Sequence, residues 1–426
     1  MRLSFKKLFL LLVIIILLFS LANCKKSSKG KTVTVWTLWP ESVQDTNAIA
    51  FHEALESAKT DMPDIIIEHD GTENEAYKTK IKTAMAADEV PDVFFAWGAG
   101  FVKPFVEADK VLALDDYIAK DGVLDKMEGG ANGFFTFNGK IYGLTGYGWV
   151  ASLYCNKELF DKAGAKIPDT YDEFKDAIVK LKKAGIVPIS VGEKDRWPGM
   201  FWQNAFAIRT AGAAECNKAL AGEASFDTPD FVKSAALLKE LVDMGAFADG
   251  VLGLSYDEAN AFFLQGKAAM SYMGNWFAGD IMGTNSTVSD KIIAKKFPVL
   301  SDGKGGATEF LGGAIDGLCV SKSAKNKEAS VKVAAYLMQH IAMNLQKKGE
   351  GIPTWKVSDI KSEKINPVVE QIKELVKGST GWVLAWDTFL SGADADDHKN
   401  LIAEIFGGKL SPEDFAKKMQ AMNEKK

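Results

Sequence analysis

Short apolar runs alternate with amphipathic helical patterns along most of the chain. Runs with the length of buried strands occur at residues 32–36, 65–68, 92–96, 151–155, 268–273 and 317–320. They are dispersed over the whole sequence, and segments with a helical spacing of apolar residues lie between them. Strands that alternate with helices are typical of sheets covered by helices on both faces. The pattern therefore predicts an α/β architecture.

Helix starts can be located from their capping residues. Thr170 and Ser255 are each followed three positions later by a glutamate, Glu173 and Glu258. In such a capping box, each side chain accepts a hydrogen bond from a backbone amide that the first helical turn leaves without a partner. Ser411, directly before a proline, predicts a further helix start.

The first 24 residues have the pattern of an export signal. Arg2, Lys6 and Lys7 precede an almost unbroken apolar run at 8–21. This run is shorter than the ~20 residues that a membrane-spanning helix needs, so a cleaved leader at 1–23 is expected. Its end, Leu-Ala-Asn-Cys, resembles the bacterial lipobox, which implies that Cys24 is diacylated and becomes the mature N-terminus. The alternative is a plain secretory leader with an incidental cysteine.

Composition and net charge limit the kinds of protein that the chain can be. The chain has 426 residues, of which 47% are hydrophobic and 25% charged, so two packed lobes are expected. The net charge is −5, and no long basic run follows the first 31 residues, so nucleic acid is not an expected partner. Residues 24–31 are polar and aperiodic, and we expect them to form a flexible tether.

Cysteine and histidine do not suggest a metal or redox site. With Cys24 assigned to lipid, three cysteines remain, and an odd number cannot form a complete set of disulfides. The four histidines are scattered without metal-ligand spacing, so we expect no metal and no cofactor. The residues concerned are Cys155, Cys216 and Cys319, and His52, His69, His340 and His398.

The ten tryptophans lie mostly at the ends of predicted strands or in loops flanked by glycine and proline. In open α/β sheets, ligands bind beyond the carboxyl ends of the strands. Flat rings beside Asp, Glu and Asn suit a sugar, because its C–H faces stack on aromatics and its hydroxyls need hydrogen-bonding partners. The alternative for any one ring is that it fills a lobe edge or an oligomer interface.

Several segments resemble the bacterial family 1 extracellular solute-binding proteins, which serve carbohydrate ABC importers. The segments are NGKIYGL at 138–144, SLYCNKELF at 152–160, PDTYDEF at 168–174, FLQGKAAM at 263–270 and GNW at 274–276. The resemblance covers roughly residues 32–420. It implies a two-lobed, type II-like periplasmic-binding-protein fold, in which several strand crossovers form a hinge and the ligand cleft lies between the lobes.

The same resemblance implies a division of the chain. The N-terminal lobe is expected at 32–147 and 308–350, and the C-terminal lobe at 148–307 and 351–426. The hinge is expected near residues 147–151 and 312–316. Closure of the hinge would trap the solute.

Ligand contacts are carried over position by position. Trp276 in the Gly-Asn-Trp segment is the expected sugar-stacking ring, and Trp386 beside Asp387 is expected to supply a second one. Glu41 and Asp316 are candidate acceptors for sugar hydroxyls, with ordinary solvated carboxylates as the alternative. The full set of expected contacts is Trp39, Glu41, Trp97, Gly98, Tyr147, Trp149, Trp197, Trp202, Asn275, Trp276, Gly313, Asp316, Trp386 and Asp387.

The predicted function is sugar binding for an ABC importer, by a monomer that is exported, lipid-anchored, and periplasmic or at the cell surface. The expected partners are a carbohydrate and the permease subunits. No motif of a serine hydrolase, a P-loop enzyme or a zinc protease is present, so we expect no enzyme activity. The alternatives are an exported glycoside hydrolase and a binding protein of the same fold for a non-sugar solute.

Overall fold

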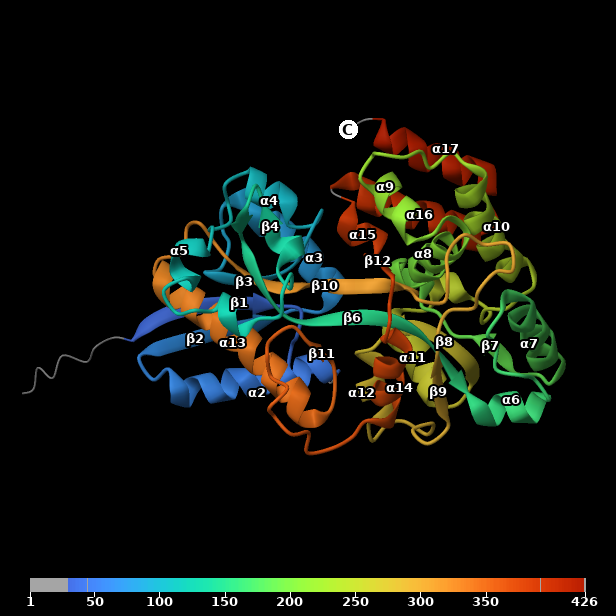
Figure 1. Ribbon diagram of the computed structural model, residues 1–426, viewed down its shortest axis with the longest axis horizontal. Coiled ribbons are helices and arrows are strands. Elements are labelled where there is room, and N and C mark those ends of the chain that lie inside the picture. The colour runs from blue at the N-terminus through green and yellow to red at the C-terminus, as the bar shows by residue number, and fades with distance from the viewer. Residues whose placement is uncertain (1–29, 44, 391, 425–426) are drawn as a thin grey trace, which may run out of the picture.

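The structure is a computed structural model that describes residues 30–43, 45–390 and 392–424. Two lobes lie side by side, each built from strands and covering helices (Figure 1). The predicted leader, Cys24 and the tether up to residue 29 lie outside the described residues. In the part of the chain that is described, no helix is long and apolar enough to cross a membrane.

The N-terminal lobe begins with three parallel strands. In β1, positions from Val33 onward alternate between fully and partly buried, as expected for a strand that is covered on one face. Asp45 caps the helix that follows, because its side chain accepts a hydrogen bond from the amide of Ala48. The main elements are β1 (Lys31–Thr37), β2 (Ile65–Gly71), β3 (Val93–Trp97), α2 (Thr46–Asp61), α3 (Asn74–Ala87) and α13 (Lys327–Lys348).

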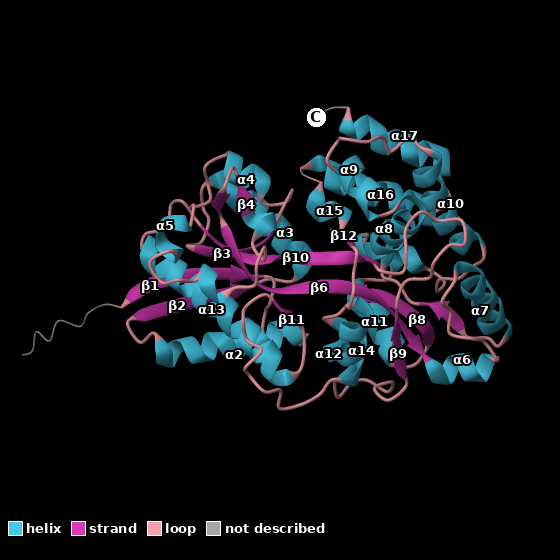
Figure 2. Ribbon diagram, in the orientation of Figure 1, coloured by secondary structure: helices cyan, strands magenta, loops and turns pink. Residues whose placement is uncertain are grey.

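The C-terminal lobe combines a small sheet with many helices (Figure 2). Both predicted capping boxes are present, at Thr170 before α7 and at Ser255 before α11. The elements used below are α7 (Tyr171–Lys183), β7 (Val187–Ile189), α8 (Trp197–Ala211), α11 (Tyr256–Leu264), β8 (Ala268–Gly274), α12 (Phe277–Met282), β9 (Ile292–Lys295), α14 (Pro367–Val376), α15 (Trp386–Phe389) and α16 (Ala393–Phe406).

Two long strands, β6 (Gly143–Asn156) and β10 (Glu309–Val320), run from one lobe to the other across the middle of the molecule (Figure 1). They pair with each other in antiparallel fashion and place the strands in the order β2-β1-β3-β10-β6-β8-β7. The chain passes between the lobes a third time between α13 and α14, where β11 (Ile352–Pro353) pairs with β6. These three crossings give the two-lobed α/β fold that the sequence predicts.

The pairing of β6 with β10 is irregular at the point where the strands change lobe. Gly313 lies opposite Trp149 and Asp316 opposite Tyr147, and the register shifts on both sides of Asp316. The backbones approach closely at Gly312, where a Cβ would lie 2.2 Å from the carbonyl oxygen of Trp149. An interrupted ladder bends more easily than a regular one, so the geometry is that of a hinge.

Each lobe has its own hydrophobic core. One core draws on residues 33–147 and 318–357, and the other on residues 149–315 and 368–422. Phe310 and Ile315 therefore pack in the C-terminal core and Trp355 in the N-terminal core. The chain therefore changes lobe within β10, between residues 315 and 318, and again between residues 357 and 368. The expected boundaries were at 307/308 and 350/351.

The predicted strands are confirmed. Five of the six runs fall within β1, β2, β6, β8 and β10, and the run at 92–96 is displaced by one residue from β3. Cys155, Cys216 and Cys319 are buried free thiols.

Candidate functional site: a cavity between the lobes

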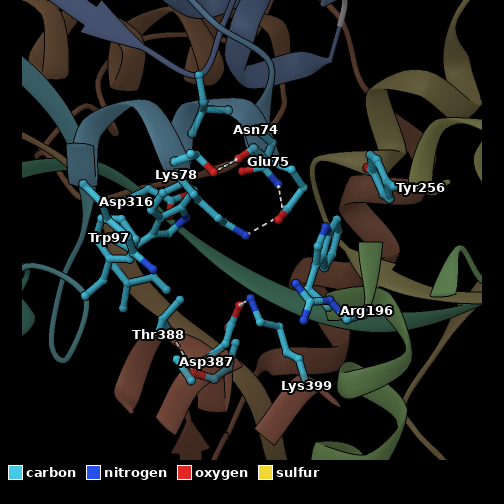
Figure 3. Close-up of a pocket in the computed structure, with 18 of the residues that line it drawn as sticks. Asn74, Glu75, Lys78, Trp97, Arg196, Tyr256, Asp316, Asp387, Thr388 and Lys399 are labelled. Atoms are coloured by element: carbon cyan, nitrogen blue, oxygen red, sulfur yellow. Dashed lines mark hydrogen bonds and ion pairs between the residues drawn. The ribbon is translucent and has the colours of Figure 1, made fainter. Parts of the chain in front are cut away.

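A cavity of about 630 Å³ lies between the two lobes, beside the hinge strands. It is lined from the N-terminal lobe by α3 and by the loops after β1 and β3, and from the C-terminal lobe by α8, α11, α15 and α16. Figure 3 shows polar side chains facing one another across it. The volume is in the range of small-molecule binding sites.

Five aromatic side chains of the C-terminal lobe form one wall of the cavity, called here the aromatic wall. Trp149 stacks on Phe201, with ring centroids 5.3 Å apart and planes 4° from parallel. Trp276 meets Trp149 nearly edge-on at 5.4 Å, and Trp197 lies 4.8 Å from Tyr256. Because these rings hold one another in place, they offer a rigid apolar surface to a ligand.

The position of Trp276 follows from its neighbours in the sequence. Its ring folds back over Gly274, where a Cβ would come within 2.1 Å of the ring. Its indole Nε1 donates a hydrogen bond to the hydroxyl of Tyr256 at 2.9 Å. Asn275 does not line the cavity, because its Oδ1 accepts a hydrogen bond from the amide of Val150 and ties β8 to β6.

On the opposite side of the cavity, Trp97 stands at the end of β3, paired with Asp316 of β10. Phe101 meets it edge-on at 4.9 Å, and the Nζ of Lys78 lies 5.2 Å from its ring centroid. Trp39 also reaches the cavity but is only 1% exposed, since it packs against Phe51 in the N-terminal core. Aromatic surface is thus present on both lobes.

Charged and amide groups complete the lining (Figure 3). The Nζ of Lys78 is 2.7 Å from Oε1 of Glu75 on α3. Across the cavity, the Nζ of Lys399 lies 3.8 Å from Asp387 and 3.1 Å from Asp396. Burial opposes the charge on Lys399, but the two carboxylates outweigh it and raise the pKa of the amine.

Two carboxyl groups of the cavity lining hold protons more tightly than usual. Burial raises the pKa of Asp316 to about 7, against the hydrogen bond from Tyr147, which lowers it. Burial also raises the pKa of Asp45, despite backbone hydrogen bonds that lower it, and the charge of Asp257 adds to the rise. At neutral pH, Asp316 therefore exists in both protonation states and can either donate to or accept from a hydroxyl.

Eight of the expected contact residues line this cavity, and six lie elsewhere. The eight are Trp39, Trp97, Tyr147, Trp149, Trp197, Trp276, Asp316 and Asp387. Besides Asn275, the backbone of Gly98 is packed against Phe134, and Gly313 pairs with Trp149 inside the sheet. Glu41 is exposed in the turn that follows β1.

Trp202 and Trp386 are corrections to the expected set, because both rings are fully buried in the C-terminal core. Trp202 lies on α8 and packs against Phe174 and Tyr272, on the helix face turned away from the cavity. Trp386 stacks against His398 at 5.1 Å. Both rings are enclosed by their neighbours in the core and leave no surface for a ligand to stack on.

The sequence analysis missed a polar group of lining residues. These are Asn74, Glu75, Lys78, Arg196, Tyr256, Thr388 and Lys399. Charged residues on a helix look like a solvated face when only the sequence is known, and nothing marks α3 as facing another lobe. Tyr256 carries a usable signal, because it follows the Ser255 cap and so stands at a helix start.

Two lobes, three chain crossings and a cavity lined from both lobes define the class of two-lobed binding proteins that hold a solute between their lobes. The profile of the bacterial extracellular solute-binding proteins matches residues 48–343. The chain belongs to this family. In the described part of the chain, no group of three or more His, Cys, Asp or Glu residues could hold a metal ion.

Curated relatives are distant. The chain is 26% identical over 273 residues to an ABC transporter extracellular-binding protein of Pyrococcus horikoshii, covering 61% of each chain. It is 25% identical over 300 residues to the multiple sugar-binding protein of Streptococcus mutans, covering 68% of each.

Solved structures resemble the chain over nearly its whole length. One, from a study of xylan utilization by the thermophilic bacterium Caldanaerobius polysaccharolyticus, is 41% identical with a TM-score of 0.87, covering 92% of this chain and 99% of that one. A chitin oligosaccharide binding protein is 27% identical with a TM-score of 0.84, covering 93% and 99%.

Proposed function

We propose that the protein is the extracytoplasmic sugar-binding component of an ABC importer. The observation that carries the proposal is the cavity between the lobes, with aromatic rings on both lobes and polar groups between them. The aromatic wall can cover the C–H face of a sugar ring, while Asn74, Asp316 and Thr388 are placed to hydrogen-bond hydroxyls. Membership of the solute-binding family supports the same function.

For the ligand, we propose a short oligosaccharide derived from xylan. The support is the 41% identity and TM-score of 0.87 to the structure from the study of xylan utilization. A cavity of about 630 Å³ has room for more than a single small solute. Sugars of other kinds, and solutes that are not sugars, are the competing ligands.

We further propose that the mature chain is monomeric and attached to the membrane by lipid on Cys24, and that it delivers the sugar to separate permease subunits. The bound sugar is expected to remain chemically intact. Recovery of unhydrolysed oligosaccharide after long incubation with the protein would separate this function from that of a glycoside hydrolase.

A screen of melting temperatures against solutes of several classes tests the proposal. A ligand that binds only the folded protein stabilises it by RT ln(1 + [L]/Kd), about 2.7 kcal/mol at a hundredfold excess over Kd. Xylo-oligosaccharides are expected to raise the melting temperature, and amino acids, polyamines and phosphate esters are not. A shift with only the non-sugar solutes would contradict the proposal.

A further inference from the structure

The cavity carries an excess of negative charge. Among the described lining residues, seven have carboxyl groups and four have basic groups. The acids are Asp45, Glu73, Glu75, Asp257, Asp316, Asp387 and Asp396, and the bases are Lys78, Lys82, Arg196 and Lys399. Even when Asp316, whose pKa burial raises to about 7, holds a proton, six carboxylates remain against four cations.

The two lysines of α3 already have carboxylate partners. Lys78 is 2.7 Å from Glu75, one turn before it on the same helix. Lys82 is 3.9 Å from Asp396, which belongs to the other lobe. An anionic ligand would have to compete with these carboxylates for each ammonium group.

The bases on the C-terminal side are also engaged. Lys399 lies between Asp387 and Asp396, and its side chain is only 5% exposed. Arg196 donates a hydrogen bond through Nη1 to the side-chain oxygen of Asn400. Of the four cations, Arg196 is the one whose partner here is a neutral group, so it is the group most able to attract an anion.

Three helices that begin at this cavity, α2, α3 and α11, carry a carboxylate of the chain at the N-terminus, where an anion would otherwise be attracted, whereas the first turn of α8 has no acidic residue. Asp45 caps α2 and Glu73 caps α3 through hydrogen bonds to backbone amides. Asp257 occupies the first turn of α11. The positive ends of these helices are therefore already balanced before a ligand enters.

The carboxylates also affect one another across the cavity. Burial is the main cause of the raised pKa of Asp316, and the negative charge of Asp45 raises it further. A carboxylate brought in by a ligand would meet the same cost of burial and the same repulsion, while a hydroxyl would meet a much smaller cost of burial and no repulsion between like charges.

We propose that this cavity selects neutral sugars and rejects sugars that carry a carboxylate, and that Asp45 is one of the residues that set this preference. The proposal rests on the proposed function, since it concerns the same site. It adds the charge class of the ligand, which neither the family nor the aromatic wall determines.

The test compares two ligands that differ at a single group, which is a carboxylate in one and a neutral hydroxymethyl group in the other. One is a xylo-oligosaccharide with a hexuronic acid branch, and the other is the same compound with the carboxyl group reduced to an alcohol. Calorimetric titration is expected to give the reduced form at least about tenfold higher affinity in 50 mM salt. The ratio should shrink in 500 mM salt, because salt screens the repulsion.

Asp45→Asn is the informative variant, because asparagine also caps helices well and the substitution removes only the charge. It should lower the ratio of the affinity for the reduced ligand to the affinity for the acid about two- to threefold. Asp172→Asn is the matched control, because Asp172 also lies in the first turn of a helix, α7, but its side chain is 84% exposed and outside the cavity. It should leave the ratio unchanged.

Equal affinity for both forms would overturn the proposal, and so would tighter binding of the acid that Arg196→Gln abolishes. If the unbranched xylo-oligosaccharide binds but the reduced branched compound does not, the size of the branch excludes the ligand from the cavity. The charge proposal is then also overturned. Failure of every neutral sugar to bind would contradict the proposed function itself.

Discussion

Trp276 is the residue on which the aromatic wall depends most directly. Its ring contacts Trp149, lies over Gly274 and is held by a hydrogen bond to Tyr256. Truncation of a buried aromatic contact costs on the order of 2 kcal/mol or more, so Trp276→Ala should weaken sugar binding about thirtyfold. Trp276→Phe should retain part of the affinity, as measured by titration of intrinsic fluorescence.

Trp202→Ala is the control for this prediction, because Trp202 is fully buried away from the cavity. It should lower the melting temperature through the void that it leaves. The affinity of the folded fraction should remain close to that of the wild type. If Trp276→Ala showed this same behaviour, the ring would be a core residue and its assigned role would be wrong.

Asp280 gives a pH-dependent prediction at the residue scale. Burial raises its pKa from 3.8 to about 8, and the nearby charges of Asp45, Asp257 and Glu350 contribute. Between pH 3.8 and about pH 8, Asp280 holds a proton in the folded chain that it has lost in the unfolded chain. The contribution of Asp280 to the stability of the folded state therefore falls as pH rises. It is fully present below about pH 4 and is lost by about pH 8.

Asp280→Asn should therefore raise the melting temperature at pH 8.5, on the order of 2 °C, and less at pH 5. Scanning calorimetry at the two values measures the difference. Asp172→Asn, on the exposed side of α7, should show no such dependence on pH. If Asp280→Asn changed the melting temperature equally at both pH values, the pKa of Asp280 would not be raised in the folded protein.

At the scale of elements, the crossing of β6 and β10 depends on Gly312. A Cβ at this position would lie 2.2 Å from the carbonyl oxygen of Trp149. Gly312→Ala should therefore destabilise the protein by about 1–3 kcal/mol, as overpacking does. Gly306→Ala, where the nearest atom is 3.9 Å away, should have little effect on denaturant unfolding. Equal stability of the two variants would contradict this packing.

Strands and helices could be predicted from the sequence where a local pattern of residues marks them. Six strands could be predicted because short runs rich in apolar residues mark them, and the helices after Thr170 and Ser255 could be predicted from their capping residues. The first halves of β6 and β10, at 143–150 and 309–316, were not found because they are rich in glycine. These halves form the hinge, where regular pairing is interrupted.

The candidate site was predicted in part for a related reason. Trp97 and Trp276 could be expected at the cavity because they come at the ends of strands, and such ends meet at one edge of a sheet, whereas Trp149 was expected from the resemblance to the family. Trp386 could not be distinguished from them, since its burial depends on helices that arrive from distant parts of the chain. Lys78 was missed because it lies within a charged helix, and only the second lobe turns that helix into a cavity wall.

At the scale of the whole molecule, membrane attachment should be independent of sugar binding. Cys24 lies outside the described residues, and the lobes begin about seven residues later with β1. Cys24→Ser is expected to release the protein into the soluble exported fraction with unchanged affinity, because it removes the acceptor for lipid and none of the residues that line the cavity. Membrane fractionation measures this, and unchanged partitioning would contradict the lipid anchor.

The account as a whole rests on a sugar held between the two lobes. Calorimetric titration of the wild-type protein with xylo-oligosaccharides tests this claim most directly. We predict one sugar per chain, with a negative change in heat capacity from burial of the aromatic rings on both lobes. Absence of binding to every oligosaccharide tested, while a non-sugar solute binds one to one, would contradict it.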